Sequence, residues 1–207
     1  MDVNNLKMPK NKKIGILRGG GDCPGLNSVI RAVTKSAHEH DYEVLGFKDS
    51  FKGLVENDFI RLTNPMVSNI LTQGGTILGT SNIANPYKWS FKNKKGDVFF
   101  KDVSQKAISN FKKNNLEALI VLGGDGSMTI ANKLVKSKLN IIGIPKTIDN
   151  DLPLTDTTFG FNTAVAALME LVNSLYRLKV RLTLPSSKLW RQNLETLVLL
   201  LAPPFQP

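Results

Sequence analysis

Three turns, each placed directly after a run of apolar residues, constrain the fold of this chain more than any other feature. Two of them are rich in glycine, Gly19–Gly25 and Gly123–Ser127, and the third, Pro145–Asp151, carries acidic residues and a lysine. Continuous apolar runs are typical of parallel strands that are buried on both faces. Because α/β folds bind ligands at the carboxyl ends of such strands, the three turns predict one ligand site.

The rest of the chain alternates between strand and helix patterns. Helical spacing of apolar residues alternates with the apolar runs, which predicts an α/β fold: a doubly wound, mainly parallel sheet with helices on both faces. The expected strands are Lys12–Leu17, Tyr42–Phe47, Ala118–Leu122 and Ile141–Ile144, and the expected helices are Asn27–His40, Pro65–Leu71, Val103–Asn114, Ser127–Ser137 and Thr163–Leu178. Between them we expect a turn containing Gly53, a loop at Gly74–Thr76 and a hairpin or mobile excursion within Asn85–Asp102.

Composition narrows the class of protein. Charged or amide residues interrupt every apolar run, so no membrane span is expected, and the polar N-terminus has no apolar signal core. The single cysteine, Cys23, fits a reducing compartment, and we expect a cytoplasmic protein in which Cys23 fills space. The net charge of +10 raises nucleic acid as a partner, but the lysines are scattered among polar residues, so nucleic acid is not expected.

The first turn has the features of an anion site. It lies between a predicted strand and a predicted helix, where bare glycine amides and a helix N-terminus favour phosphate. Its glycine spacing matches neither the dinucleotide fingerprint nor the P-loop. A tight structural turn, held by the side chain of Asp22, remains an equal alternative.

The second turn adds a carboxylate. Asp125 lies between glycines at the end of a buried strand, where it could hold Mg²⁺ beside phosphate oxygens. Ser127 could cap the following helix and also donate to a phosphate. The alternative is an ordinary helix cap with an Asx turn.

The third turn favours proton transfer. Alternate residues of an extended segment face one side, so Thr147, Asp149 and Asp151 can converge. Since neighbouring carboxylates repel, one can accept a proton while the other binds metal or orients a hydroxyl. Together the three turns predict a phosphoryl-transfer site, with purely structural carboxylates as the alternative.

Residues 13–178 resemble the N-terminal portion of the 6-phosphofructokinase family. Four motifs occur in the family's order, which makes chance similarity untenable. They are Gly20–Asn27, Gly74–Gly79, Gly123–Ser127, and Pro145–Asp151 with Phe159–Ala164.

The resemblance implies transfer of a phosphoryl group to the 1-hydroxyl of fructose 6-phosphate, giving fructose 1,6-bisphosphate in glycolysis. It implies that Asp149 is the general base, assisted by Thr147 and Asp151, and that Lys146 neutralises the transferred group. It assigns the donor's phosphates and nucleoside to Gly20, Gly21, Asp22, Phe51, Gly123, Gly124, Asp125, Gly126 and Ser127, with Mg²⁺ on Asp125. It also implies that full-length relatives are homo-oligomers.

The resemblance alone leaves open whether the phosphoryl donor is ATP or pyrophosphate. Pyrophosphate-dependent members tend to carry aspartate at the position of Gly126 and lysine at that of Lys146. Gly126 leaves room for the α-phosphate and nucleoside of ATP, whereas Lys146 suits either donor. ATP is therefore expected, with pyrophosphate as the alternative.

Two departures from the family pattern bear on activity. Asn82 stands where the family usually has a phosphate-binding arginine, and Lys88 and Lys92 are the candidates to replace its charge. The segment 179–207 does not match, and all 16 glycines lie at or before Gly160. Codons for Pro185–Trp190 can be chosen so that the shifted frame reads Ile-Val-Glu-Val-Met, the family's next motif.

We therefore divide the chain into a flexible N-terminus, 1–12, a donor-binding domain, 13–178, and a tail, 179–207, for which we hypothesise a frameshift. The missing acceptor half predicts impaired catalysis by the 207-residue chain. A non-catalytic nucleotide-binding fragment is the alternative.

Overall fold

A computed structural model describes residues 12–23, 25–71, 73–93 and 95–147. The chain divides into two compact units, 1–146 and 147–207, and the architecture below is that of the first. The predicted helix Thr163–Leu178, Asp149, Asp151 and the tail lie outside the described residues.

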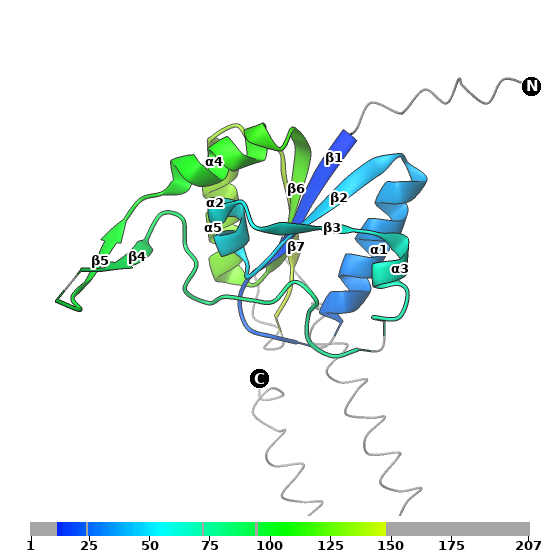
Figure 1. The fold of residues 1–207 in the computed structure, drawn as a ribbon, viewed down its shortest axis with the longest axis horizontal. Coiled ribbons are helices and arrows are strands. Elements are labelled where there is room, and N and C mark those ends of the chain that lie inside the picture. The colour runs from blue at the N-terminus through cyan, green and yellow to red at the C-terminus, as the bar shows by residue number, and fades with distance from the viewer. Residues whose placement is uncertain (1–11, 24, 72, 94, 148–207) are drawn as a thin grey trace, which may run out of the picture. The chain divides into compact units, whose positions relative to one another are not determined.

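The first unit is built on a five-stranded sheet in the order β3-β2-β1-β6-β7 (Figure 1). β1 is central and pairs in parallel with β2 and β6, while β6 pairs in parallel with β7. Only β3, at one edge, runs antiparallel. The strands are β1 Lys12–Arg18, β2 Tyr42–Phe47, β3 Phe59–Leu62, β6 Leu116–Gly123 and β7 Ile141–Pro145. β6 lies inside the sheet because its sequence is an almost unbroken apolar run, and every residue of β6 except Glu117 is buried.

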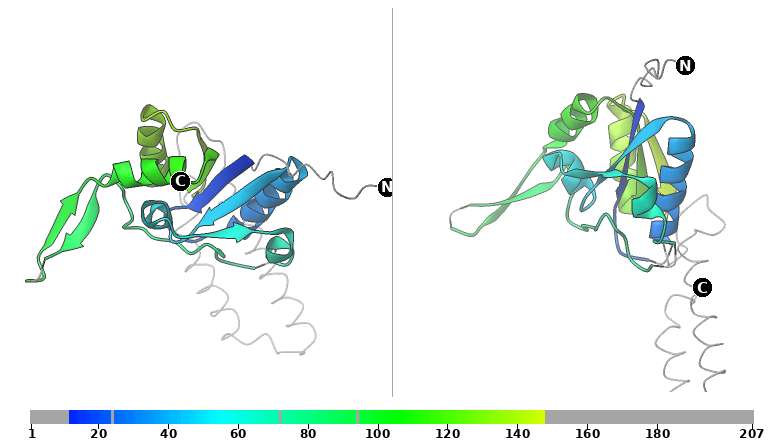
Figure 2. Two further views of the ribbon diagram at one scale, coloured as in Figure 1. Left: turned by 45° about the horizontal axis from the view of Figure 1, so that its top comes forward. Right: turned by 45° about the vertical axis from the view of Figure 1, so that its right-hand side comes forward.

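Helices cover both faces of the sheet, as the alternation of patterns predicts (Figures 1 and 2). On one face lie α1 Leu26–Glu39 and α3 Asn64–Val67, and on the other α2 Phe51–Glu56, α4 Ser104–Lys113 and α5 Asp125–Lys136. In α1 the buried side chains recur at helical spacing, at Leu26, Ile30, Thr34 and Ala37. The expected mainly parallel α/β fold is confirmed. None of the helices within the described ranges is long and apolar enough to cross a membrane.

The main hydrophobic core fills the space between the sheet and α2, α4 and α5. Leu17, Leu45, Phe47, Leu119 and Val121 project from the strands into it. From the helices come Phe51, Leu54, Ala107, Ile108, Phe111, Ala131 and Leu134. This core fixes the ends of β1 and β6, where the candidate site begins.

The excursion between residues 85 and 102 is a hairpin, as expected. It pairs β4 Trp89–Lys92 with β5 Val98–Lys101 and extends away from the five-stranded sheet (Figure 2). Phe91 stacks on Phe99 within it, with ring centroids 5.5 Å apart.

Two local predictions need correction, and one strand was not predicted. Gly53 lies inside α2, because Phe51, Leu54 and Val55 face the core at helical spacing, and a Cβ at Gly53 would lie 2.4 Å from the Lys48 carbonyl. The helix predicted at 65–71 spans only Asn64–Val67, and β3 was not predicted. The predicted first strand, Lys12–Leu17, is confirmed; it extends by one residue to Arg18, and Lys12 pairs with Tyr42.

Candidate functional site

The two glycine turns lie side by side because β1 and β6 are neighbours in the sheet. The Gly19 amide donates to the Leu122 carbonyl at 2.8 Å, which extends the pairing with β6 by one residue beyond the end of β1. A Cβ built on Gly20, whose φ is +81°, would lie 4.0 Å from the Gly124 nitrogen. The sheet therefore brings the first two predicted turns together at one edge.

A cleft of about 380 Å³ opens at this edge; we call it the donor cleft. Its lining includes four glycines, several small polar side chains and one carboxylate, and exposed glycine amides of this kind suit phosphate. Its lining residues are Gly20, Gly21, Ser50, Phe51, Ser81, Asn82, Ala84, Asn85, Gly124, Asp125, Gly126, Ser127 and Ile130.

Ser127 fills the space between the two turns. A Cβ at Gly123 would lie 2.5 Å from the Ser127 hydroxyl oxygen, and one at Gly19 would lie closer still. Gly123 therefore leaves no room for a side chain, since the Ser127 Cβ would lie 2.5 Å away as well, whereas at Gly19 the Ser127 hydroxyl would have to rotate. Ser127 is not the helix cap considered from the sequence, because α5 begins at Asp125 and Gly124 is its N-cap, without a side-chain cap.

Asp125 and Gly126 form the open side of the cleft. Asp125 is exposed in the first turn of α5, and a Cβ at Gly126 would meet nothing within 4 Å. In the described part of the chain, no three metal-ligating side chains gather. A cation at Asp125 would therefore complete its shell with phosphate oxygens and water, as Mg²⁺ commonly does.

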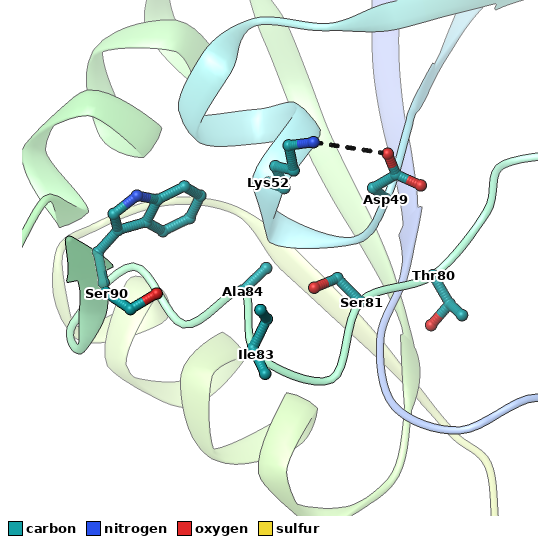
Figure 3. A pocket seen from close by; sticks show the side chains of 8 residues that line it. Asp49, Lys52, Thr80, Ser81, Ile83, Ala84 and Ser90 are labelled. Carbon is teal, nitrogen blue, oxygen red and sulfur yellow. Dashed lines mark ion pairs between the residues drawn. The ribbon is translucent and has the colours of Figure 1, made fainter. Parts of the chain in front are cut away.

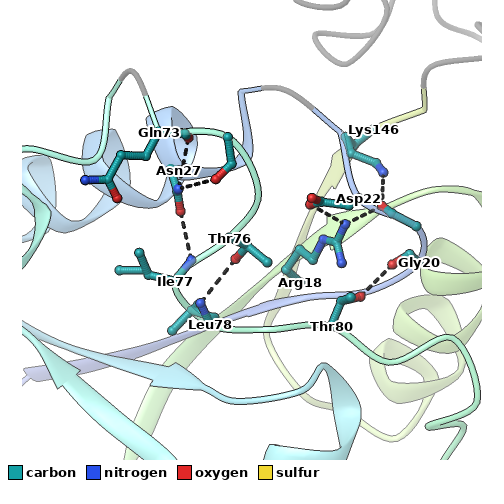
Figure 4. Close-up of polar contacts among 12 residues, drawn as sticks. Arg18, Gly20, Asp22, Asn27, Gln73, Thr76, Ile77, Leu78, Thr80 and Lys146 are labelled. Carbon is teal, nitrogen blue, oxygen red and sulfur yellow. Dashed lines mark hydrogen bonds and ion pairs between the residues drawn. The ribbon is translucent and has the colours of Figure 1, made fainter.

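Side chains from three segments hold the first turn (Figure 4). The Thr80 hydroxyl donates to the Gly20 carbonyl at 2.6 Å. The Gly21 carbonyl accepts from Arg18 Nη2 and, at 2.6 Å, from Lys146 Nζ. Arg18 Nη2 also lies 3.1 Å from Asp22 Oδ1, so this turn is fixed by a set of polar contacts.

The two cations beneath this turn are buried. Arg18 is 0% exposed and Lys146 is 5% exposed. Burial lowers the pKa of both groups, an effect that Asp22 opposes in each. The thiol of Cys23, also buried as expected, has its pKa raised by burial, an effect that the nearby Lys146 opposes. Two positive charges thus lie under the glycine backbone with one carboxylate beside them.

Asn27 ties the loop that carries Thr80 to the start of α1. Its Nδ2 donates to the Gln73 carbonyl at 3.1 Å, and its Oδ1 accepts from the Ile77 amide at 2.9 Å (Figure 4). Asn27 is buried, so both bonds are shielded from water. The Asn27 side chain therefore links the motif Gly20–Asn27 to the motif Gly74–Gly79.

Several predicted site residues do not line the donor cleft. Asp22 faces Arg18, and Lys146 lies under the first turn. Phe51 does line the cleft, but it is only 1% exposed and belongs to the core. Thr147 is buried at the boundary of the described residues.

Sequence reasoning missed part of the cleft wall. Ser50, with a φ of +69°, and Ile130 carry no motif, so nothing in the sequence indicated them. Asn82 does line the cleft, at the place where the missing arginine was inferred. Lys88 lies 4.9 Å from the centroid of the Phe100 ring in the hairpin, and neither it nor Lys92 is a lining residue.

A second hollow, of about 450 Å³, adjoins the donor cleft and shares Ser81 and Ala84 with it (Figure 3). Lys52 and Asp49, whose charged atoms are 3.9 Å apart, lie on one side of it. Thr80 lines this second hollow and not the donor cleft. The segment from Thr80 to Ala84 therefore separates two spaces.

The fold and the paired glycine turns define a doubly wound α/β protein with a candidate phosphate site between β1 and β6. The comparison with protein families gives the particular family. The phosphofructokinase model matches residues 13–179, and the chain belongs to this family.

Individual relatives agree with this assignment. The chain is 50% identical over 166 residues to ATP-dependent 6-phosphofructokinase 2 of Clostridium perfringens, covering 80% of this chain and 45% of the relative. It is 46% identical over 163 residues to pyrophosphate–fructose 6-phosphate 1-phosphotransferase of Dictyoglomus thermophilum, covering 79% and 44%. The chain thus spans about half the length of the curated relatives it matches.

Solved structures show the same fold. Phosphofructokinase from Pichia pastoris in the T-state superimposes with a TM-score of 0.64 at 30% sequence identity. The match covers 79% of this chain and 18% of that one.

Proposed function

We propose that this chain is the donor-binding part of an ATP-dependent 6-phosphofructokinase. The observation that carries the proposal is the donor cleft, where the glycine turns after β1 and β6 meet beside the carboxylate of Asp125. Such a site positions phosphates and neutralises their charge, which is most of what catalysis of phosphoryl transfer requires. Membership of the family supports the same reaction.

In this proposal the cleft binds ATP through its backbone. Gly20, Gly21 and the amides of Gly124, Asp125 and Gly126 hold the phosphates, because these residues line the cleft at the positive end of α5. Ser127 contributes its hydroxyl, since its amide donates to the Gly124 carbonyl. Asp125 holds Mg²⁺, which would neutralise the phosphate charge when bound.

The acceptor is fructose 6-phosphate, by the family resemblance. Asp149 takes the proton from its 1-hydroxyl, Thr147 and Asp151 assist, and Lys146 supplies positive charge near the transferred group. The place of this reaction would be the cytoplasm.

Pyrophosphate is the second candidate donor, since the Dictyoglomus thermophilum relative is named for it and Lys146 lies beneath the first turn. Gly126 favours ATP, because open space around it leaves room for the α-phosphate and nucleoside. A non-catalytic nucleotide-binding role is supported by Asn82, which brings no charge to the cleft.

Substitution of Gly126 tests the donor. We expect Gly126→Asp to lose ATP binding at least tenfold in titration calorimetry with Mg²⁺ present, because the added carboxylate repels the α-phosphate. Binding of pyrophosphate should change much less. Gly126→Asn, nearly the same size without the charge, separates repulsion from crowding.

The outcomes are distinct. Binding of ATP by the unmodified chain, lost in Gly126→Asp, supports the ATP proposal. Binding of pyrophosphate alone by the unmodified chain would replace ATP as the donor. Binding of neither would refute a donor site. A coupled assay for fructose 1,6-bisphosphate on the same samples then separates an enzyme from a binding protein.

A further inference from the structure

We propose that Arg18, Thr80 and Lys146 are positioning residues that hold the carbonyls of Gly20 and Gly21. They thereby keep the Gly21 and Asp22 amides aligned on the outer side of the first turn, where Gly21 lines the donor cleft and a phosphate of the donor can reach them. The inference rests on the proposed function, since it assigns how the first turn binds that donor. It adds Arg18 and Thr80 to the machinery and gives Lys146 a role that works through the backbone.

The Gly20 carbonyl is held from the side of the second hollow. Thr80 Oγ1 donates to it at 2.6 Å, and Thr80 lines that hollow, whereas Gly20 lines the donor cleft. A trans peptide directs its carbonyl and its N–H in opposite directions. Because Gly20 O faces Thr80, the N–H of Gly21 faces away from Thr80.

The Gly21 carbonyl is held more firmly still. Both Arg18 Nη2 and Lys146 Nζ donate to it, so two charged donors occupy one acceptor. Hydrogen bonds with a charged donor are stronger than neutral ones. The same peptide geometry then directs the N–H of Asp22 away from the buried cations.

The two amides are available to a ligand. Gly21 and Asp22 are exposed, and among the described residues neither N–H donates a hydrogen bond. Successive free amides in a turn form a concave anion-binding surface. Such a surface binds well only if its amides are already aligned, because aligning them on binding costs conformational entropy.

The charges around the first turn also favour binding of an anion. Arg18 and Lys146 bring two buried positive charges beneath the turn, and Asp22, whose side chain is 54% exposed, offsets one of them. Arg18 Nε and Nη1 have no hydrogen-bond partner within the part of the chain that the structure describes. The guanidinium is thus only partly satisfied by the protein, and its excess charge favours an anion on the outer side of the turn.

Thr80 gives the cleanest test because it is exposed and its change can be isosteric. We expect Thr80→Val to weaken binding of inorganic pyrophosphate about fivefold in titration calorimetry, the effect of one lost hydrogen bond. Thr80→Ser keeps the hydroxyl and should bind like the unmodified chain. Thr80→Ala, without the branched side chain, should repeat the loss.

Thr63→Val is the matched control. Thr63 is exposed at the N-cap of α3 and makes no side-chain cap bond. Its substitution should leave pyrophosphate binding unchanged. In ¹⁵N-resolved NMR spectra, pyrophosphate should shift the Gly21 and Asp22 amide signals of the unmodified chain strongly and those of Thr80→Val weakly.

Equal binding by Thr80→Val, Thr80→Ala and the unmodified chain would overturn the inference while leaving the donor site intact. Weakened binding in Thr80→Ser as well would also overturn it, because the hydroxyl would not be the cause. If the unmodified chain binds neither pyrophosphate nor ATP, the donor proposal itself fails, and the inference fails with it.

Discussion

The two glycine turns lie side by side yet are held in different ways. In the second turn the backbone holds itself: the Lys146 amide donates to the Gly123 carbonyl, and the Ser127 and Met128 amides donate to the Gly124 carbonyl. In the first turn the side chains of Arg18, Thr80 and Lys146 hold the carbonyls, from three segments far apart in the sequence.

This difference determines what each turn tolerates. A turn held by a strand and a helix fails when its backbone is crowded, because the packing around it cannot relax. A turn held by side chains keeps its fold after one of them is replaced but loses the alignment of its amides. Substitutions in the second turn should therefore lower the stability of the fold, whereas loss of a side chain that holds the first turn should lower the affinity for the ligand.

Gly123→Ala, in the second turn, is the substitution with the largest expected effect. The new Cβ would lie 2.5 Å from both Cβ and Oγ of Ser127 and 3.0 Å from the Gly19 carbonyl oxygen. We expect the free energy of unfolding to fall by about 1–3 kcal/mol, as overpacking typically costs, measured by urea denaturation. Gly126→Ala, which meets open space, is the control and should cost nothing. Equal stability of both variants would contradict this account.

Asp125→Asn comes next in size and tests the second turn's charge. We expect affinity for ATP in the presence of Mg²⁺ to fall at least about tenfold, since a metal ligand is lost. Without Mg²⁺ the affinity should stay the same or rise, because one negative charge has been removed. A loss of the same size in both conditions would show that Asp125 does not act through a cation.

Asn82→Arg sharpens the comparison at a residue of the donor cleft that belongs to neither glycine turn. Asn82 is exposed there, so a guanidinium can reach a phosphate without burial of its charge. We expect pyrophosphate affinity to rise by about fivefold, less than a buried charged hydrogen bond would give. Asn82→Gln, which lengthens the side chain without charge, should have little effect, and an equal gain from it would rule out the electrostatic reason.

The smallest effect expected is a pH dependence from Lys146. Burial lowers the pKa of Lys146 below the ordinary lysine value, so between these two values the unfolded chain binds more protons than the folded one. Stability relative to Lys146→Met should therefore rise with pH as the folded ammonium loses its proton, and level off above the ordinary lysine pKa. Parallel stability curves from neutral pH to pH 11 would show that burial of this charge costs nothing.

The sequence predicted what depends on local pattern. Apolar runs located four strands of the parallel sheet, and glycine after β6 located the turn that the following helix holds. It did not reveal that Arg18, Thr80 and Lys146 meet, because their contacts depend on how distant segments pack. The same holds for Ser50 and Ile130, which reach the cleft only through tertiary structure. β3 was missed because a four-residue edge strand leaves little apolar pattern.

The pairing of β1 with β6 has a consequence for how the molecule assembles. Register places Ile16 opposite Ile120, so most of the described chain lies between the two partners. Contacts between distant segments form slowly, because the intervening loop must close first. The β4–β5 hairpin can form from neighbouring residues within microseconds. The donor cleft, in contrast, can form only after β1 and β6 have paired. Ligand binding would therefore report on the late steps of folding.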